Sequence, residues 1–365
     1  WISEDRGEEG RARLLGGRSA MGRVTKLTKE GEVVLTGHSK PVQALSWSAD
    51  GQKLATASSD TTARIWTVDA HREGKELQLK EHSDSVDGVA WNPTHNDIIA
   101  TASADKSIRI WDIRARKSQV IPMGDEVLNV VFSPDGNFMI SSDKTETLRV
   151  VDVRNNKNKV VAEACFDGQY WVNELVVNSN SDVVLMCAGR QGNMQEKGVV
   201  EILKIFHNGD KIELKPVHKI ISHSANCTAI AIDSESKHFA TGAYDGTACI
   251  WDAAELVCLR PCCTSLEEGI QNLGFSYDGS LIAGVCDLDS RSQAKKMVDI
   301  SSVETGSTLF RIETRATPRQ LSWHPSQLVL AYGGERAPEV QERYGNRDDR
   351  SKVEVPITVT SFSAK

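Results

Sequence analysis

A histidine and an aspartate recur together in this sequence at a spacing that could serve acid–base chemistry. Histidine, aspartate and a hydroxyl are the side chains of a hydrolase triad, in which the imidazole takes a proton from the nucleophile. The pairs are His38 with Asp60, His82 with Asp105 and His223 with Asp245. Because a catalytic site is not built three times in one chain, we interpret the pairs as structural and predict no catalytic residue.

Each pair is accompanied by a threonine and a tryptophan at fixed distances. The threonine stands four residues before the aspartate, and the tryptophan stands six residues after it. These side chains can form a chain of hydrogen bonds in which the indole donates to the hydroxyl, the hydroxyl to the imidazole and the imidazole to the carboxylate. The expected networks are His38, Thr56, Asp60 and Trp66; His82, Thr101, Asp105 and Trp111; and His223, Thr241, Asp245 and Trp251.

Other kinds of chemistry lack the residues that they need. Cys258, Cys262 and Cys263 lie close together, but the second pair of ligands that a zinc site requires does not follow. The sequence has no phosphate-binding loop, dinucleotide fingerprint, nucleophile elbow or zinc-protease motif. We therefore predict reduced thiols, no bound metal, no cofactor and no enzymatic activity.

The composition of the chain argues against direct binding to nucleic acid and against insertion into a membrane. The chain has 365 residues and a formal net charge of −7, which disfavours a basic groove for nucleic acid. No apolar run reaches the roughly 18 residues that span a bilayer, and no signal-peptide pattern opens the chain, so we expect an intracellular protein without a membrane anchor. Residues 1–21 lack hydrophobic periodicity, and we expect a disordered or non-native tail there, followed by a single domain over residues 22–365.

The recurring side chains mark a repeat with a period of about 40–45 residues. Clear copies cover residues 37–66, 81–112 and 222–252, and weaker copies cover residues 127–153, 172–206, 270–303 and 319–362. Short β-branched segments separated by turn-forming residues predict four strands in each copy. Seven such copies predict an all-β, seven-bladed WD-repeat β-propeller, because a lone blade would leave its edges and apolar faces exposed. We expect residues 32–35 to close the ring as the outermost strand of the last blade, beside residues 355–362.

Several segments go beyond the generic repeat. They are HSDSVD at residues 82–87, TASADKSIRIWDIR at 101–114, VNE at 172–174, FATG at 239–242, ELVC at 255–258, VETG at 303–306 and WHP at 323–325. In this order and in these blades they resemble the THO complex subunit 3 family, the WD-repeat subunit of the THO/TREX mRNA-export complex, over residues 33–362. Two loops, at residues 190–197 and 287–296, are longer than the family pattern.

The resemblance implies a non-catalytic interaction scaffold in the nucleus. Its partners would be the helical scaffold subunits of a THO-like hetero-oligomer that couples transcription to mRNP assembly and nuclear mRNA export, and its contact with RNA would be indirect. A different interpretation rests on Trp111-Asp112-Ile113-Arg114. This W-D-x-R box resembles the one by which substrate receptors of cullin-type ubiquitin ligases dock, and only that interpretation depends on Arg114.

Three long connections predict which face binds partners. Residues 190–197, 287–296 and 333–352 each join the second and third strands of a blade, and alternate connections in a blade emerge on opposite faces. All three should therefore lie on one face, where charged loops framing aromatic side chains are typical of protein interfaces. The candidate residues are Tyr170, Trp171, Arg190, Tyr244, Arg291, Arg336 and Arg343.

Overall fold

The computed structural model describes residues 24–68, 76–154, 158–166, 171–189, 197–209, 211–266, 268–286, 296–314, 316–335 and 354–365. In these ranges every element is a β-strand. None of the described segments forms a helix long and apolar enough to cross a membrane.

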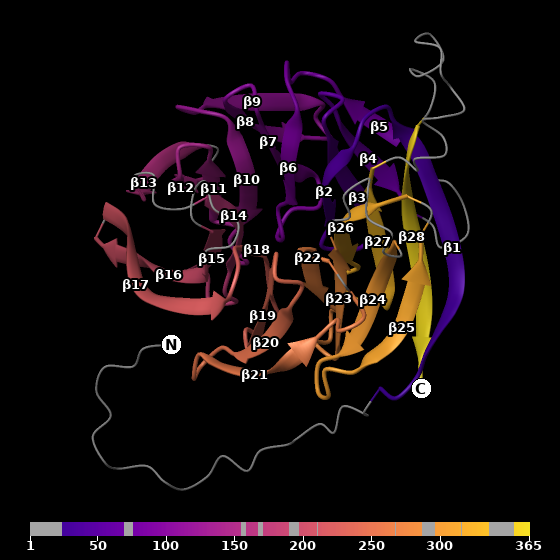
Figure 1. The fold of residues 1–365 in the computed structure, drawn as a ribbon. Helices are drawn as coiled ribbons and strands as arrows, with labels where there is room; N and C mark the ends of the chain where they lie inside the picture. Colours follow the sequence, from indigo (N-terminus) through magenta and orange to yellow (C-terminus); the bar gives the residue numbers. More distant parts are fainter. Residues whose placement is uncertain are drawn as a thin grey trace, which may run out of the picture.

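Seven four-stranded antiparallel sheets form the blades of a ring, which confirms the predicted all-β, seven-bladed propeller (Figure 1). From the innermost to the outermost strand, blade 1 consists of β2 (Val42–Trp47), β3 (Lys53–Ser58), β4 (Ala63–Thr67) and β5 (Glu76–Leu79). In the same order, blade 2 consists of β6 (Val86–Trp91), β7 (Ile98–Ser103), β8 (Ser107–Asp112) and β9 (Lys117–Pro122). Blade 3 consists of β10 (Val127–Phe132), β11 (Phe138–Asp143), β12 (Thr147–Asp152) and β13 (Lys159–Cys165). Blade 4 consists of β14 (Trp171–Val177), β15 (Val183–Gly189), β16 (Gly198–Asn208) and β17 (Lys211–His223). Blade 5 consists of β18 (Cys227–Ile232), β19 (His238–Ala243), β20 (Ala248–Asp252) and β21 (Val257–Cys262). Blade 6 consists of β22 (Ile270–Phe275), β23 (Leu281–Cys286), β24 (Met297–Ser302) and β25 (Thr308–Glu313). Blade 7 consists of β26 (Pro318–Trp323), β27 (Val329–Gly334), β28 (Val355–Ala364) and β1 (Leu27–His38).

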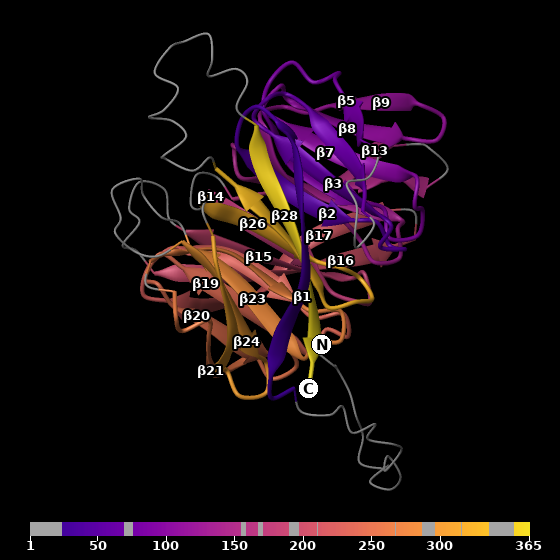
Figure 2. The same ribbon diagram turned by 90° about the vertical axis from the view of Figure 1, so that its right-hand side faces the viewer.

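The two ends of the described chain meet in blade 7. β1 pairs with β28 in antiparallel register, with Leu27 opposite Ala364 and Leu35 opposite Ile357. Figure 2 shows these two strands side by side along the seam of the ring. The strand is longer than residues 32–35, where the sequence placed it, because its pairing extends along almost all of β28.

The seam between blades 1 and 7 depends on a tight turn at Gly51. Its φ of +71° falls in the left-handed region, and a Cβ atom at this position would overlap the imidazole of His324. Ser326 N donates to Nδ1 of His324 at 3.2 Å, so the opposite ring nitrogen, Nε2, carries the proton that reaches Gly51 O at 3.1 Å. Burial lowers the pKa of His324, which favours this neutral form.

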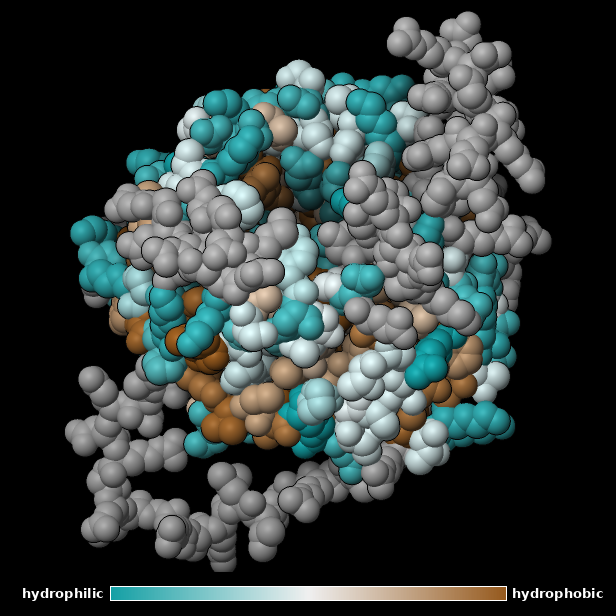
Figure 3. Space-filling model, in the orientation of Figure 1, coloured by the Kyte–Doolittle hydropathy of each residue, from teal (hydrophilic) through white to brown (hydrophobic). Residues whose placement is uncertain are grey.

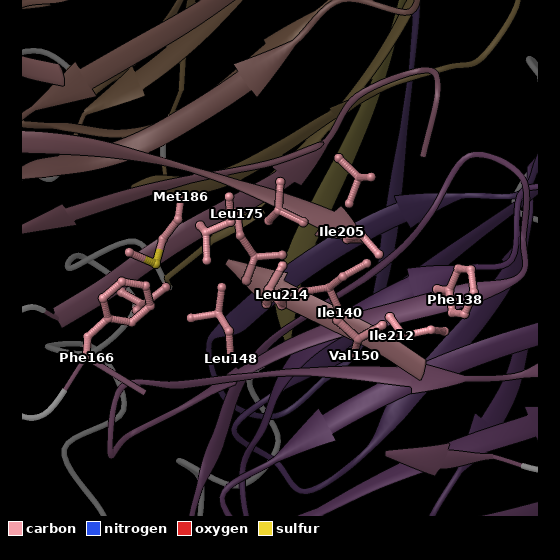
Figure 4. Close-up of a cluster of buried hydrophobic side chains, with 14 of the residues drawn as sticks. Phe138, Ile140, Leu148, Val150, Phe166, Leu175, Met186, Ile205, Ile212 and Leu214 are labelled. Atoms are coloured by element: carbon pink, nitrogen blue, oxygen red, sulfur yellow. The ribbon is translucent and has the colours of Figure 1, made fainter. Parts of the chain in front are cut away.

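Apolar layers between neighbouring blades form the core. The second strand of each blade is covered on both faces, so β15 is buried along its whole length. Figure 4 shows the layer between blades 3 and 4, where Ile140 and Leu148 of blade 3 pack with Leu175, Met186 and Leu214 of blade 4. Full burial of one such side chain contributes about 1.5–3 kcal/mol, so the ring is stabilised mainly by contact between blades.

Candidate functional site

The His, Thr, Asp and Trp side chains of blade 2 lie in one internal network. Trp111 Nε1 donates to Thr101 Oγ1 at 2.9 Å, and Thr101 Oγ1 lies 2.7 Å from His82 Nε2. His82 Nδ1 lies 2.7 Å from Asp105 Oδ2. The same distances in blade 1 are 3.0 Å from Trp66 to Thr56, 2.7 Å from Thr56 to His38 and 2.8 Å from His38 to Asp60.

The electrostatics of this network suit a structural role. Burial lowers the pKa of His82 and outweighs the opposite effect of Asp105. Burial also acts to raise the pKa of Asp105, but hydrogen bonds from Ser107 and His82 lower it overall. A neutral imidazole therefore donates through Nδ1 to an ionised carboxylate and accepts the Thr101 hydroxyl proton at Nε2. Thr101 is fully buried, so a substrate cannot reach the hydroxyl that a triad would use as its nucleophile.

The network of blade 5 departs from the expected direct bond between His223 and Asp245. His223 Nδ1 lies 2.8 Å from Thr247 Oγ1 and 3.7 Å from the nearest carboxylate oxygen of Asp245. Thr247 in turn donates to Asp245 Oδ1, so its hydroxyl relays the contact. Both carboxylate oxygens of Asp245 already have donors, since Thr247 binds Oδ1 and both the backbone N–H and the hydroxyl of Ser224 bind Oδ2, at 2.9 and 2.8 Å. The remaining bonds, from Trp251 and His223 to Thr241, are each 2.8 Å long.

Blade 6 contains a network that the sequence analysis missed. The carboxylate of Asp299 is fully buried and accepts hydrogen bonds from Ser301 Oγ at 2.7 Å, from Thr308 Oγ1 at 2.8 Å and from Ser265 Oγ. Ser301 in turn accepts the backbone N–H of Cys263 at 3.1 Å. This blade lacks the Trp–Asp pair, and hydroxyls around one carboxylate link its strands instead.

The innermost strands of the seven blades surround a central channel of about 480 Å³. Each of these strands has a β-bulge after its first residue, or after Val172 in β14. The extra residue re-aims side chains at the start of the strand. Polar residues that line the channel are Gln43, Ser46, Asp87, Asn129, Asn173, Glu174, Thr228, Gln271, Asn272 and Gln320.

Glu174 links three blades across the wall of this channel. Its Oε2 accepts the backbone N–H of Ile230 in blade 5 at 2.9 Å, and its Oε1 accepts Asn272 Nδ2 of blade 6 at 3.0 Å. Asn272 Oδ1 continues the chain to the backbone N–H of Leu321 in blade 7 at 3.3 Å. The carboxyl keeps some surface toward the channel but lies deep in the ring, and burial raises its pKa to about 8 despite both hydrogen bonds. It is therefore mostly protonated at neutral pH.

Two of the predicted partner-binding residues lie close together on the top face, which we define as the face where each innermost strand begins. Trp171 opens β14 and pairs with Gly189. Gly189 lies so near the Asn226 side chain that a Cβ atom would overlap it, and Asn226 O accepts the N–H of Tyr244 at 3.0 Å. Trp171 of blade 4 is thus joined through two residues to Tyr244 of blade 5.

The other predicted residues of this face lie outside the described residues: Tyr170, Arg190, Arg291, Arg336 and Arg343. The strands that flank the three long connections are described. Gly189, Cys286 and Gly334 end the second strands of blades 4, 6 and 7, and each pairs with the first residue of its innermost strand. All three connections therefore leave from the top face.

The W-D-x-R box lies at the opposite end of blade 2. Asp112 pairs with Ile98, the first residue of β7, so the box stands on the bottom face. Trp111 is buried and its indole N–H is bound by Thr101, whereas Arg114 is exposed.

The cysteines give no metal centre in the described part of the chain. None of the eight forms a disulfide. Among the described residues, no group of three or more His, Cys, Asp or Glu side chains is arranged to hold a metal ion.

Comparison with known proteins finds the same repeat. The family model "WD domain, G-beta repeat" matches residues 30–67, 74–112 and 214–252. Each matched unit contains residues of the outermost strand of one blade and ends in the third strand of the next, so repeats interlock successive blades. These are the units that contain the three Trp–Thr–His sets.

Curated relatives match most of the chain. THO complex subunit 3 of Arabidopsis thaliana is 36% identical over 302 residues, which is 82% of this chain and 88% of the relative. WD repeat-containing protein AAC3 of Dictyostelium discoideum is 27% identical over 87% of this chain and 65% of its own length. Protein TEX1 of Saccharomyces cerevisiae is 23% identical over 68% of this chain and 60% of its own length. With this fold and this similarity along its length, the chain belongs to the THO complex subunit 3 family of WD-repeat proteins.

Proposed function

We propose that this protein is a non-catalytic interaction subunit of a THO-like complex that couples transcription to mRNP assembly and nuclear mRNA export. The observation that carries the proposal is the 36% identity to a THO complex subunit over most of both chains. The protein acts in the nucleus as part of a hetero-oligomer, and its partners are the large helical subunits of that complex. Its net charge of −7 is consistent with indirect contact with RNA.

Affinity purification tests this function. A tagged chain, expressed at its natural level, is recovered from nuclear extract, and the bound proteins are identified and quantified by mass spectrometry. We expect the helical THO subunits in stoichiometric amounts and no loss of them after nuclease treatment, because contact with RNA is indirect. Recovery of a cullin adaptor without any THO component, abolished by Arg114→Ala, would instead assign the chain to a ubiquitin ligase.

We further propose that the top face around Trp171 and Tyr244 contributes to the partner interface. Trp171 is 42% exposed although it is a large aromatic side chain, and such residues dominate binding energy when a partner covers them. Tyr277 provides a matched control, because it is 40% exposed but lies in the turn between β22 and β23 on the bottom face.

The test compares variants of these aromatic residues. We expect Trp171→Ala with Tyr244→Ala to reduce recovery of the helical subunits at least about tenfold, and Tyr277→Ala to leave it unchanged. A second variant shortens residues 190–196, 287–295 and 336–353 to ordinary turns. If both variants fold and recover the subunits at full yield, the top face is not the interface.

A further inference from the structure

The outer rim of blades 4 and 5 has an unusual concentration of exposed apolar side chains. Among the described residues, eight large apolar side chains are exposed, and four of them are Val217, Ile221, Val257 and Leu259. The first two lie on β17 and the last two on β21, the outermost strands of these neighbouring blades. Ile221 is 62% exposed and Val257 is 55% exposed. Figure 3 shows apolar surface gathered over this part of the ring, at the lower left.

The outermost strand β21 also differs from its counterparts in charge. Each of the other six outer strands has an exposed charged side chain, namely Lys29 on β1, Glu76 on β5, Lys117 on β9, Lys159 on β13, Lys215 on β17 and Arg311 on β25. Such charges protect sheet edges from unwanted association. The exposed residues of β21 are Val257, Cys258, Leu259 and Pro261, which have none. Its single charged residue, Arg260, is half-buried and donates to Val303 O at 3.0 Å and to Glu304 O of blade 6.

The backbone at this rim excludes a partner that adds a strand. β21 has Pro261, which has no N–H to donate, and a bulge at Leu259 where the register with β20 shifts. β17 has the same combination, with Pro216 next to a bulge at Val217. A regular ladder of backbone hydrogen bonds cannot form along either edge. A partner must therefore bind through side-chain packing, as an amphipathic helix does when its apolar face covers an apolar surface.

The charges beside the apolar residues indicate the rest of the partner's chemistry. On β17, Lys215 forms an ion pair with Glu213 of the same strand, and Lys219 lies opposite Glu201 of β16, with which it interacts electrostatically. The apolar residues are therefore bordered by charges of both signs. A helix with polar residues of both charges beside its apolar stripe would complement this border.

We propose that the blade 4–5 rim, defined as Val217, Ile221, Val257, Cys258 and Leu259, binds the apolar face of an amphipathic helix from a large subunit of the same complex. The proposal rests on the proposed function, because it takes its partner from the THO-like assembly. It is separate from the top face, since these strands form the outer wall of the ring.

Two native thiols allow the rim to be tested without mutation. Cys258 and Cys165 are the two exposed cysteines, and Cys165 lies on β13 of blade 3. The chain is alkylated with N-ethylmaleimide, free and in the complex purified after co-expression with the helical subunits, and labelling of each thiol is followed by mass spectrometry. We expect labelling of Cys258 to slow at least about tenfold in the complex and labelling of Cys165 to stay within about twofold, because an interface core excludes solvent.

A pair of charge insertions provides an independent measurement. Ile221→Lys with Val257→Lys should reduce recovery of the helical subunits at least about tenfold. Val120→Lys is the matched control, because Val120 is 49% exposed on β9, the outer strand of blade 2, and its variant should recover them fully.

The outcomes separate this inference from the proposed function. If the unmodified chain recovers no helical subunit, the proposed function fails. If it recovers them but Cys258 reacts as fast in the complex as in the free chain, the rim inference is overturned and the function stands. A free chain that dimerises with Cys258 protected would make a second copy the occupant and would also overturn the inference.

Discussion

Glu174 makes the stability of the ring depend on pH in a direction that is unusual for a carboxylic acid. Most glutamates in folded proteins are ionised at neutral pH, but burial raises the pKa of Glu174 from its ordinary 4.5 to about 8. The folded protein therefore holds a proton that the unfolded chain releases at much lower pH. Stability contributed by this group is fully present below pH 4.5 and is lost as the pH rises toward 8, after which the loss is constant.

The magnitude follows from the difference between the two pKa values. From 4.5 to about 8, at about 1.4 kcal/mol per pH unit, the free energy of unfolding would fall by about 5 kcal/mol. Solvent in the channel stabilises the carboxylate and reduces this figure. We therefore expect a loss of at least about 2 kcal/mol between pH 5 and pH 9 that belongs to Glu174.

The variant Glu174→Gln isolates this contribution, because an amide does not ionise in this range. At pH 5 the variant should be less stable than the wild type by about 1–3 kcal/mol. The amide has a single oxygen, whereas Ile230 N and Asn272 Nδ2 each donate to a different oxygen of the carboxyl group. The stability difference between the two proteins should shrink or reverse by pH 9.

Urea denaturation from pH 5 to pH 9 measures both curves. Glu163→Gln is the control, since Glu163 is exposed on β13 and pairs with Arg149 at 3.0 Å on the surface. Its curve should stay parallel to that of the wild type. If the curve of Glu174→Gln is also parallel to the wild type over the whole range, the carboxyl is already ionised in the fold and the reasoning is wrong.

Three further perturbations test other parts of the ring. Thr101→Val should lower the free energy of unfolding by about 3 kcal/mol, because Trp111 and His82 lose a buried hydrogen-bond partner. Thr101→Ser keeps the hydroxyl and should retain most of the wild-type stability. Urea denaturation measures both variants. Gly51→Ala should cost clearly more than Gly209→Ala in thermal denaturation. Both residues have positive φ, at a strain of about 1–2 kcal/mol, but only a side chain at Gly51 would meet His324. Deletion of residues 31–36 removes most of the pairing between β1 and β28, so β28 keeps only β27 as its neighbour over that stretch and the backbone amides on its outer edge should exchange hydrogen much faster. Unchanged protection would contradict the closure by β1.

The architecture could be predicted because the repeat contains its own markers. Trp66, Trp111 and Trp251 stand at fixed distances from their threonines, and each indole donates to the hydroxyl ten residues before it. The spacing is therefore a consequence of two adjacent antiparallel strands that must bring these atoms together. Blades that lack these tryptophan and threonine residues still have turn-forming residues between their strands, so those strands were also predictable.

The contacts between blades were not predictable in the same way. Glu174 binds Asn272, which lies 98 residues away in the sequence, because innermost strands converge on a common channel. No local pattern in β14 indicates this neighbour. Asp299 was missed for a related reason, since its hydroxyl donors come from three different segments that meet only in the folded blade. In blade 5 the hydroxyl of Thr247 lies between His223 and Asp245, although the spacing of these two residues is close to that in blades 1 and 2.

The apolar rim of blades 4 and 5 is informative because its exposed side chains take no part in the interior contacts that hold the blades together. The blades are fixed by buried networks and by apolar layers between sheets, and neither includes the exposed side chains of Val257 or Leu259. Folding therefore gives no reason for apolar residues at these positions, and exposed apolar patches make a soluble protein prone to association. Arg260 shows that the strand does have a charged residue, but its guanidinium is bound to carbonyl groups of blade 6 and leaves the edge uncharged. A surface whose apolar character is not needed for the fold, and whose neighbours on the ring are charged, is best explained by a protein that covers it.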